Sequence, residues 1–570
     1  MKKATYLILY LLIVQSIYAT TYNVGPSQTY TELGDVPWIS LIAGDIVQIH
    51  WRSMPYAEKI FLRGQGTEVN PIIIRGIPNT NGDLPVLTGE NATTNAQFAS
   101  YFSSQYTEDL SLFLIYRGPN DSWSDYKPKH LIIEYLEITG VKPEHTFTDQ
   151  FGNVRNYSNF GTGICAIVCE NLTIRHCKIH HNSQGIFTNT NGDENQISRD
   201  LLIEYNEIWD NGNVDDDKHH NIYAQAAGTI IQYNKIGSLV PGSLGSSLKD
   251  RSSGTIIRYN WIESSSRAID LVECQEGCHI LTEEPNYHDA YVYGNVIEND
   301  ITQSPFASSM IHFGYDNSSV NAKRGSLFFY NNTVYIKGDT SDYWYVNLFD
   351  VTDDNNSLTM EGSLEMHNNI IHKNGTTNLR LMRDGGTIEF YTNNWLQNDY
   401  TALGYQATAN VVYTTQPILG VTPDFIDVTN KNFELINSSS CVDIATSMIG
   451  IVDTDYLPTM EYKHPANGVV RVMTGSAFDI GAFEYKNVLT TDSDEFDTSV
   501  TVYPNPAKNS FTIKIKNDSI DNVVIYSELG QELRRLNTSL INISDFNGGI
   551  YFVKISTKNG KNVIKKMIKR

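Results

Sequence analysis

One phrase of sequence recurs along the middle of the chain and restricts the folds open to it. Each copy has alternating aliphatic residues, then an asparagine, then another aliphatic residue two positions later, as in TIIQYNKI (229–236). The asparagine occupies the same slot at Asn206, Asn234, Asn260, Asn295, Asn332, Asn369 and Asn394. The steps between these positions are 28, 26, 35, 37, 37 and 25 residues, which is the spacing of a solenoid. One coil cannot bury its own apolar face, so each copy needs a neighbour above and below.

Alternation with a period of two is typical of a strand, and no sustained helical period of 3.6 residues accompanies it. The recurrent asparagine falls where the chain must bend, where stacked amides can hydrogen-bond to one another and to the backbone of adjacent coils. The opening stretch, with AGDIVQIH (43–50) and PIIIRG (71–76), resembles the cap and first coils of secreted right-handed β-helix proteins. We therefore predict an all-β fold, a right-handed parallel β-helix over residues 20–487, of which 421–485 form the final turn.

Residues 1–19 have the pattern of a signal peptide, with a basic start, an apolar centre and a small residue, Ala19, for cleavage. No later stretch approaches the ~20 apolar residues that a membrane span needs, so we expect no span. The net charge of −22 argues against nucleic acid and anionic membrane surfaces as partners. We expect an exported monomer.

Residues 488–499 are polar and acidic and are expected to be a linker, followed by a small β-sandwich over 500–570. The motifs YPNP, IYSELGQELRR and GIYFVKI in this last segment resemble the type A C-terminal sorting domain of the type IX secretion system of the Bacteroidetes group. The resemblance implies that the type IX machinery is a partner. It also implies export through the periplasm to the cell surface or the medium.

The chain contains six cysteines, and export permits disulfides. Cys274 and Cys278, in CQEGC, could close a small loop, and Cys165 or Cys169 could pair with Cys177. Buried free thiols are an equal alternative.

Unusual charged residues interrupt the repeat between 249 and 273. Counted from the preceding repeat asparagine, His220 lies 14 residues on, Lys249 lies 15 and Glu273 lies 13. These nearly equal offsets in successive coils predict that the three residues form a column on one face. Arg267 and Asp270 are expected on the coil next to Lys249.

Three further residues belong to the same prediction. Arg251 is two positions past Lys249 and points the same way if the strand continues. His312 and Asp316 could line the same face one or two coils further on.

This cluster suits the cleavage of an acidic polysaccharide by β-elimination. A base takes the proton beside a uronate carboxylate, and the charge of that carboxylate must be neutralised. A lysine can be the base if nearby arginines lower its pKa, although Asp250, Asp270 and Glu273 would raise it.

The order Lys249, Asn260, Arg267 resembles the β-helix polysaccharide lyases of the alginate lyase and chondroitinase B type. The resemblance implies that Lys249 is the base and Arg267 the acid or the carboxylate partner, often with Ca²⁺ bound. On this interpretation the substrate-binding residues are His220, Arg251, Asp270 and Glu273.

Two other functions remain open. A glycoside hydrolase would need clustered carboxylates, for which Asp270, Glu273 and residues 215–217 are the candidates. A non-catalytic, adhesin-like carbohydrate-binding protein would use the charges as an ion-pair network between coils. The lyase predicts Lys249 and Arg267 on a common open groove, the hydrolase predicts carboxylates there, and the adhesin predicts paired charges without a groove. The DNGNVDDD run (210–217) could also bind Ca²⁺.

Overall fold

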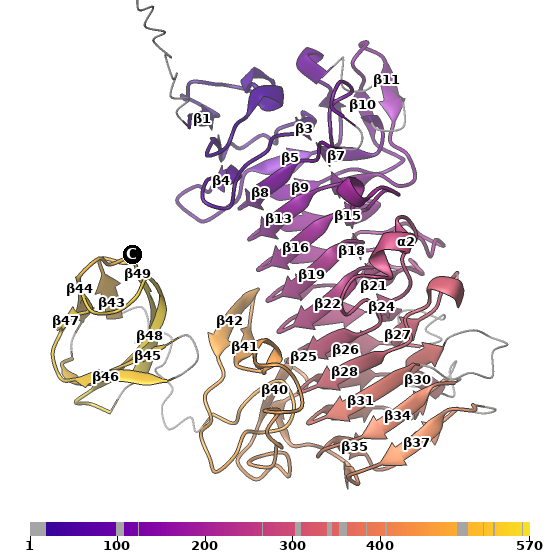
Figure 1. Ribbon diagram of the computed structural model, residues 1–570, viewed down its shortest axis with the longest axis vertical. Helices are drawn as coiled ribbons and strands as arrows, with labels where there is room; N and C mark the ends of the chain where they lie inside the picture. Colours follow the sequence, from indigo (N-terminus) through magenta and orange to yellow (C-terminus); the bar gives the residue numbers. More distant parts are fainter. Residues whose placement is uncertain are drawn as a thin grey trace, which may run out of the picture. The chain divides into compact units, whose positions relative to one another are not determined.

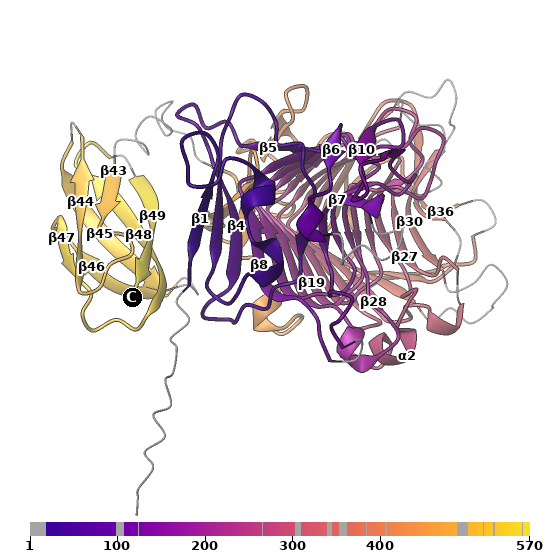
Figure 2. The same ribbon diagram turned by 90° about the horizontal axis from the view of Figure 1, so that it is seen from above.

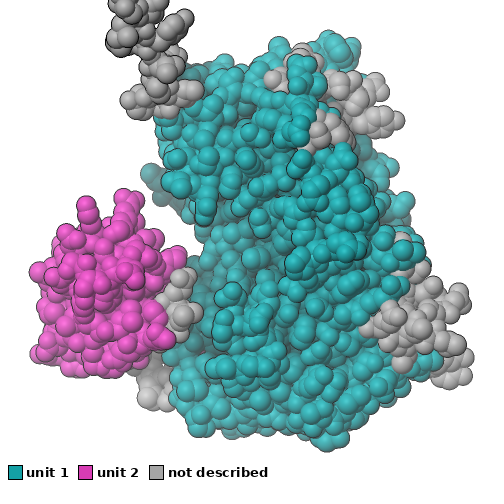
Figure 3. Space-filling model, in the orientation of Figure 1, with its two compact units in different colours: residues 1–485 teal, residues 486–570 magenta. Residues whose placement is uncertain are grey.

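The computed structural model forms two compact units, residues 1–485 and 486–570 (Figure 3). It describes residues 19–98, 108–122, 125–264, 266–301, 309–317, 319–338, 345–352, 362–383, 385–404, 407–486, 500–516, 518–527, 531–560 and 562–570. The predicted linker lies outside these described residues, as does the predicted signal peptide apart from Ala19.

Three parallel sheets run along the first unit, with 13, 11 and 11 strands in its described part (Figures 1 and 2). From β4 onward the chain passes through the first, then the second, then the third sheet in each coil, and it re-enters the first sheet one coil further on. This architecture confirms the predicted right-handed parallel β-helix.

The bounds of the strands follow, sheet by sheet. The first sheet contains β1 (Thr21–Val24), β2 (Ile46–His50), β4 (Ile72–Ile77), β8 (Lys129–Glu134), β13 (Glu170–Arg175), β16 (Arg199–Glu204), β19 (Ala227–Gln232), β22 (Ser253–Arg258), β25 (Ala290–Tyr293), β28 (Ser326–Tyr330), β31 (Ser363–His367), β34 (Thr387–Phe390) and β37 (Asn410–Tyr413). The second contains β5 (Val86–Thr88), β9 (Glu137–Thr139), β14 (Lys178–His180), β17 (Glu207–Trp209), β20 (Lys235–Ile236), β23 (Trp261–Ser264), β26 (Val296–Asp300), β29 (Thr333–Lys337), β32 (Ile370–Asn374), β35 (Trp395–Gln397) and β38 (Ile418–Gly420). The third contains β3 (Ile60–Leu62), β7 (Ser111–Ile115), β12 (Thr162–Ala166), β15 (Gln184–Thr188), β18 (Ile222–Ala224), β21 (Ser246–Asp250), β24 (Arg267–Leu271), β27 (Ile311–Gly314), β30 (Tyr345–Thr352), β33 (Asn378–Met382) and β36 (Thr401–Leu403).

The core is built from like residues stacked in register. In the first sheet Ile203 of β16 pairs with Ile231 of β19, which pairs with Ile257 of β22, and all three are fully buried. Because side chains alternate across a strand, every second residue enters this core and the others face outward.

The repeat asparagines form the predicted ladder at the bend between the first and second sheets. Asn234 and its neighbour Asn260 are fully buried, and the Nδ2 of Asn234 donates to the Oδ1 of Asn260 at 3.0 Å. The same Oδ1 accepts the backbone N–H of Asn234 at 2.9 Å, and the pattern continues from Asn206 to Asn394. Each amide therefore satisfies backbone groups that the bend removes from the sheets.

A tyrosine with a left-handed backbone precedes three of the ladder asparagines, with φ of 57°, 57° and 54° at Tyr205, Tyr233 and Tyr259. This conformation costs a non-glycine residue roughly 1–2 kcal/mol. The outward tyrosine rings stack, with centroids 4.9 Å apart for the first pair and 5.4 Å for the second. Ring stacking between coils offsets part of that cost.

Residues 421–485 do not form the expected final turn. They carry two antiparallel hairpins, β39 (Phe425–Asp427) with β40 (Asn432–Leu435) and β41 (Met460–Lys463) with β42 (Asn467–Val470). This segment returns along the outside of the coils, where Phe433 contacts Trp261 and the hydroxyl of Tyr259 donates to the Leu457 carbonyl. Aromatic residues such as Trp261 and Tyr259 on the outer face of the coils explain the difference. Another coil would extend the stack at its end and would leave these side chains exposed, whereas the returning segment buries them.

The second unit is a small antiparallel β-sandwich with its own apolar core, as predicted. One sheet contains β43 (Val500–Tyr503), β44 (Ser510–Ile515) and β47 (Leu540–Asn542), and the other contains β45 (Ile520–Ser527), β46 (Glu532–Leu536), β48 (Gly549–Thr557) and β49 (Asn562–Lys569). In the described part of the chain, no helix has the length and apolar character needed to cross a membrane.

Candidate functional site

A cleft of about 740 Å³ lies over the outward face of the third sheet. Charged and aromatic side chains line it together, among them Phe160, Phe187, His220, Tyr223, Lys249, Arg251, Glu276 and Asp316. The cleft therefore offers both apolar rings and ionic groups to a ligand.

The charged residues form a column different from the one predicted. Lys249 of β21 pairs in register with Tyr223 of β18 on one side and with Asp270 of β24 on the other, and Asp270 pairs with His312 of β27. The predicted column of His220, Lys249 and Glu273 is therefore wrong.

The error has a physical cause. Between β16 and β32 the first and second sheets are joined by two residues in every coil, so the asparagines recur in step. The connection from the second to the third sheet contains 12, 9 and 2 residues in the three relevant coils (210–221, 237–245 and 265–266). Equal counting from the asparagines consequently misplaces the third-sheet residues.

Lys249 points into the cleft between two carboxylates. Its Nζ lies 2.7 Å from Asp270 Oδ2 and 2.9 Å from Asp316 Oδ2. Burial alone would lower the pKa of the ammonium, but these two carboxylates outweigh it and raise the pKa above its ordinary value. In the free protein Lys249 therefore holds its proton.

Asp270 is the centre of this cluster and is almost fully buried. Besides Lys249, its carboxylate contacts Arg267 Nη1 at 2.9 Å and His312 Nδ1 at 2.8 Å. Burial would raise the pKa of Asp270, yet the neighbouring cations, Lys249 first, hold it well below its usual range. Arg267 is absent from the described residues that line the cleft, and it joins the cluster through Asp270 and His312, whose Nδ1 lies 3.1 Å from Arg267 Nη1.

Arg251 is the arginine that lines the cleft, and each of its nitrogens has a partner. Nε donates to the Tyr223 hydroxyl at 2.9 Å, Nη1 to the Glu273 carbonyl at 2.6 Å and Nη2 to Asp316 Oδ2 at 2.7 Å. Glu273 itself is buried and accepts the backbone N–H groups of Asp316 and Asn317 at 2.8 and 2.7 Å. It therefore holds the loop and does not face the cleft.

His220 and Tyr223 form the aromatic part of the same wall, with ring centroids 5.5 Å apart. Burial, together with the nearby Lys249 ammonium, lowers the pKa of His220 to about 3, so the imidazole is neutral. The Tyr223 hydroxyl donates to Gln275 Oε1 at 2.9 Å.

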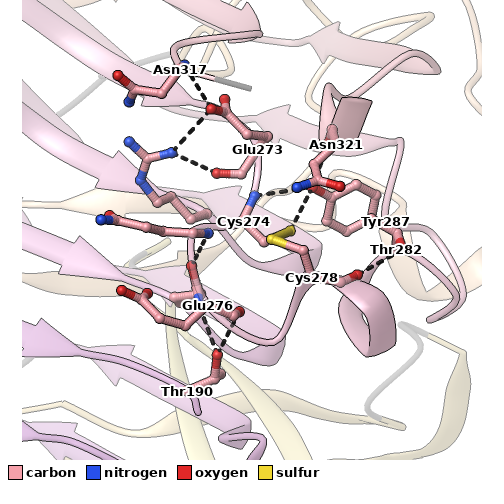
Figure 4. Close-up of a disulfide and its surroundings, with 12 residues drawn as sticks. Thr190, Glu273, Cys274, Glu276, Cys278, Thr282, Tyr287, Asn317 and Asn321 are labelled. Carbon is pink, nitrogen blue, oxygen red and sulfur yellow. Dashed lines mark hydrogen bonds and ion pairs between the residues drawn. A yellow bond between two sulfur atoms is a disulfide. The ribbon is translucent and has the colours of Figure 1, made fainter. Parts of the chain in front are cut away.

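A disulfide joins Cys274 and Cys278 at the rim of the cleft (Figure 4). It closes the small loop that was one of the pairings considered from the sequence. The loop that it closes carries Glu276, whose backbone carbonyl accepts from Thr190 at 2.9 Å. Burial raises the pKa of the Glu276 carboxyl, which lines the cleft.

The remaining cysteines, at positions 165, 169, 177 and 441, are free and buried, which excludes a bridge to Cys177. Burial raises the pKa of each thiol to about 12.

We therefore expect iodoacetamide to label no cysteine of the native protein at mildly alkaline pH, because thiolates are the reactive form. It should label the four free cysteines after denaturation and all six after reduction. Mass spectrometry of the labelled peptides checks this. Labelling of Cys274 without reduction would contradict the assigned disulfide.

No group of three or more His, Cys, Asp or Glu side chains within the described residues is arranged to hold a metal ion. Calcium binding therefore stays a prediction.

The comparisons with known proteins identify the second unit. Residues 501–570 match the family described as the secretion system C-terminal sorting domain. Together with the fold, this match defines an exported parallel β-helix protein. The chain is a substrate of the type IX secretion system, which delivers it to the cell surface or the extracellular space.

Solved structures that are similar to this chain include three carbohydrate-related proteins at low sequence identity. DFA-IIIase from Arthrobacter chlorophenolicus A6, solved without its lid, is 10% identical, with a TM-score of 0.35 over 66% of this chain and 89% of that one. A GH136 lacto-N-biosidase from Eubacterium ramulus is 13% identical, with a TM-score of 0.38 over 70% and 68%. A PL6 family alginate lyase is 11% identical, with a TM-score of 0.34 over 77% of this chain and 58% of that one. None of these similarities bears on the activity of this chain, and a comparison with curated proteins found no match.

Tyr223 and Glu276 are among the residues of the cleft that were not predicted from the sequence. Tyr223 alternates with the inward Ile222 and Ala224, and this short pattern was the available signal. Glu276 lies in an irregular loop, where no periodicity could have indicated it.

Proposed function

We propose that this protein is an exported lyase that cleaves an acidic, uronate-containing polysaccharide by β-elimination in the cleft on the third sheet. The observation that supports the proposal is the pair of cations, Lys249 and Arg251, side by side on the wall of a cleft that also contains aromatic rings. A polysaccharide needs both, because rings stack on sugar faces and cations neutralise uronate carboxylates.

In the proposed reaction Arg251 binds the uronate carboxylate and Lys249 acts as the base after releasing its own proton to the solvent. The Lys249 amine takes the proton from the carbon beside the carboxylate, and that electron pair forms a carbon–carbon double bond. The bond from the next carbon to the glycosidic oxygen breaks, and this oxygen takes a proton from the new ammonium group. The resemblance implies that Arg267 is the acid or the carboxylate partner. In this proposal Arg267 instead holds the Asp270 carboxylate in position.

A hydrolase is the second candidate, because two carboxyl groups of the cleft have pKa values shifted in opposite directions. Burial raises the pKa of Glu276. Burial would also raise the pKa of Asp316, but the Lys249 ammonium outweighs it and lowers that pKa. Such a pair suits a general acid and a base or nucleophile.

The test is to incubate the full chain with alginate, pectate and chondroitin, with and without Ca²⁺. Two readouts run in parallel, the ultraviolet absorbance of an unsaturated product and the release of reducing ends. A lyase gives both signals, whereas a hydrolase gives reducing ends alone. If neither signal appears with any of these glycans, the result contradicts both enzymatic functions. The carbohydrate-binding, adhesin-like function then remains.

A further inference from the structure

One carboxylate of the cleft stands where a ligand carboxylate would be bound. A single oxygen, Asp316 Oδ2, accepts from Lys249 Nζ at 2.9 Å and from Arg251 Nη2 at 2.7 Å. The side chain of Asn317 donates to the same oxygen at 2.8 Å. The two cations of the proposed site are thus bridged by an acidic group of the chain itself.

Asp316 differs from the other acidic groups of the cluster in its freedom to move. The side chains of Asp270 and Glu273 are 2% and 1% exposed, whereas that of Asp316 is 30% exposed. It follows the end of β27 and belongs to no strand. Its backbone is held separately, because the N–H groups of Asp316 and Asn317 donate to the Glu273 carboxylate. The Asp316 carboxylate can therefore rotate toward solvent while its backbone stays in place.

The two cations would keep their positions after such a rotation. Lys249 would retain Asp270 at 2.7 Å, and Arg251 would retain Tyr223 through Nε and the Glu273 carbonyl through Nη1. The side-chain amide of Asn317 would lose its bond to Asp316. Of the groups on the two cations, only Nη2 of Arg251 and one donor of Lys249 would lose a partner. These two groups face the cleft and match the two oxygens of a carboxylate.

We propose that Lys249 and Arg251 form a binding site for one carboxylate of the ligand, and that Asp316 occupies this site in the free protein. The inference rests on the proposed function in taking the ligand to be an acidic polysaccharide. Binding of a uronate displaces Asp316, and a neutral sugar gains nothing from that exchange. Asp316 is therefore a specificity-determining residue that sets how strongly the cleft selects acidic sugars.

The displacement also affects the lysine. Asp316 is one of the two carboxylates that hold the proton on Lys249. When a ligand carboxylate binds to Arg251 and Asp316 turns away, Lys249 retains Asp270 as its remaining acidic neighbour within the chain. The ligand carboxylate then takes the place of the Asp316 carboxylate beside the Lys249 ammonium.

The test measures the binding of sodium D-glucuronate and of neutral D-glucose to the full chain by calorimetry or nuclear magnetic resonance titration. Asp316→Asn keeps the shape of the side chain and removes its charge. We expect it to bind glucuronate about tenfold more tightly than the wild type, with no change for glucose. Asp217→Asn is the matched control, because Asp217 also lines the cleft and is exposed, whereas the ion pairs of Lys249 and Arg251 among the described residues are with Asp270, Glu273 and Asp316.

Glucuronate binding by Asp316→Asn that is equal to or weaker than that of the wild type would overturn the proposal. An equal gain for Asp217→Asn would also overturn it, since the effect would then be one of net charge. Thermal unfolding checks that the variants are folded, and Asp316→Ser replaces Asp316→Asn if the latter is not.

The polysaccharide assay separates the two proposals. Tighter glucuronate binding by Asp316→Asn without cleavage of any glycan supports the carboxylate site and rejects the lyase. Cleavage by the wild type with no gain in glucuronate binding rejects the role of Asp316 and retains the lyase.

Discussion

Replacing Lys249 with alanine is expected to lower the rate of polysaccharide cleavage by about 10²–10⁴-fold, the range typical of a lost general acid or base. The amine is the proposed base, and its removal also leaves the buried Asp270 without its 2.7 Å partner. The loss should appear in kcat and persist at saturating substrate, because binding can still use Arg251 and the aromatic wall. Initial rates from the ultraviolet absorbance of the unsaturated product measure it.

Two controls make this result interpretable. Lys178→Ala removes a lysine of the second sheet, outside the cleft, and should leave the rate unchanged. Lys249→Arg retains a cation between Asp270 and Asp316 but cannot supply a neutral amine, so it should remain inactive while folding normally. Full activity of Lys249→Ala would show that another group is the base.

Replacing Asn260 with alanine is expected to lower the free energy of unfolding by about 2–4 kcal/mol, since a buried hydrogen-bonded network is broken. Its Nδ2 donates to the carbonyl of Ile231 at 2.8 Å and its Oδ1 accepts from the amide of Asn234. The substitution leaves these fully buried groups without partners and opens a gap in the ladder. Chemical denaturation monitored by circular dichroism gives the difference.

Asn195→Ala provides the comparison, because Asn195 lies on the surface of the first unit and is exposed. Its free energy of unfolding should stay within about 0.5 kcal/mol of the wild type. If Asn260→Ala changes the free energy of unfolding as little as Asn195→Ala does, the hydrogen bonds of the ladder amides do not contribute measurably to stability.

The fold could be predicted because the bend that carries the ladder asparagine has a constant length. Two residues join β19 to β20 and two join β22 to β23, so a single slot recurs and its period is visible in the sequence. The aliphatic residues on either side alternate for the same reason, which exposes the core face of each strand.

The site could be predicted only in part, because it depends on connections of unequal length. Lys249 and Asp270 were correctly expected on neighbouring coils, and the register makes them direct partners. His220 lines the cleft but lies outside their row. It belongs to the coil whose connection from the second to the third sheet is the longest of the three compared above. The bridge from Asp316 to Arg251 joins residues 65 positions apart through an irregular loop, and no repeat reports such a contact.

The location of the site along the stack protects it from the ends of the solenoid. Its outward row uses β18, β21, β24 and β27, which are the fifth to eighth of the eleven strands described in the third sheet. Four strands precede this row and three follow it. Each coil in a solenoid is held mainly by its two neighbours, so fraying begins at a terminus and proceeds inward one coil at a time. Several coils can therefore open at either end while Lys249, Asp270 and Arg251 keep their geometry, a useful margin for a protein that works outside the cell.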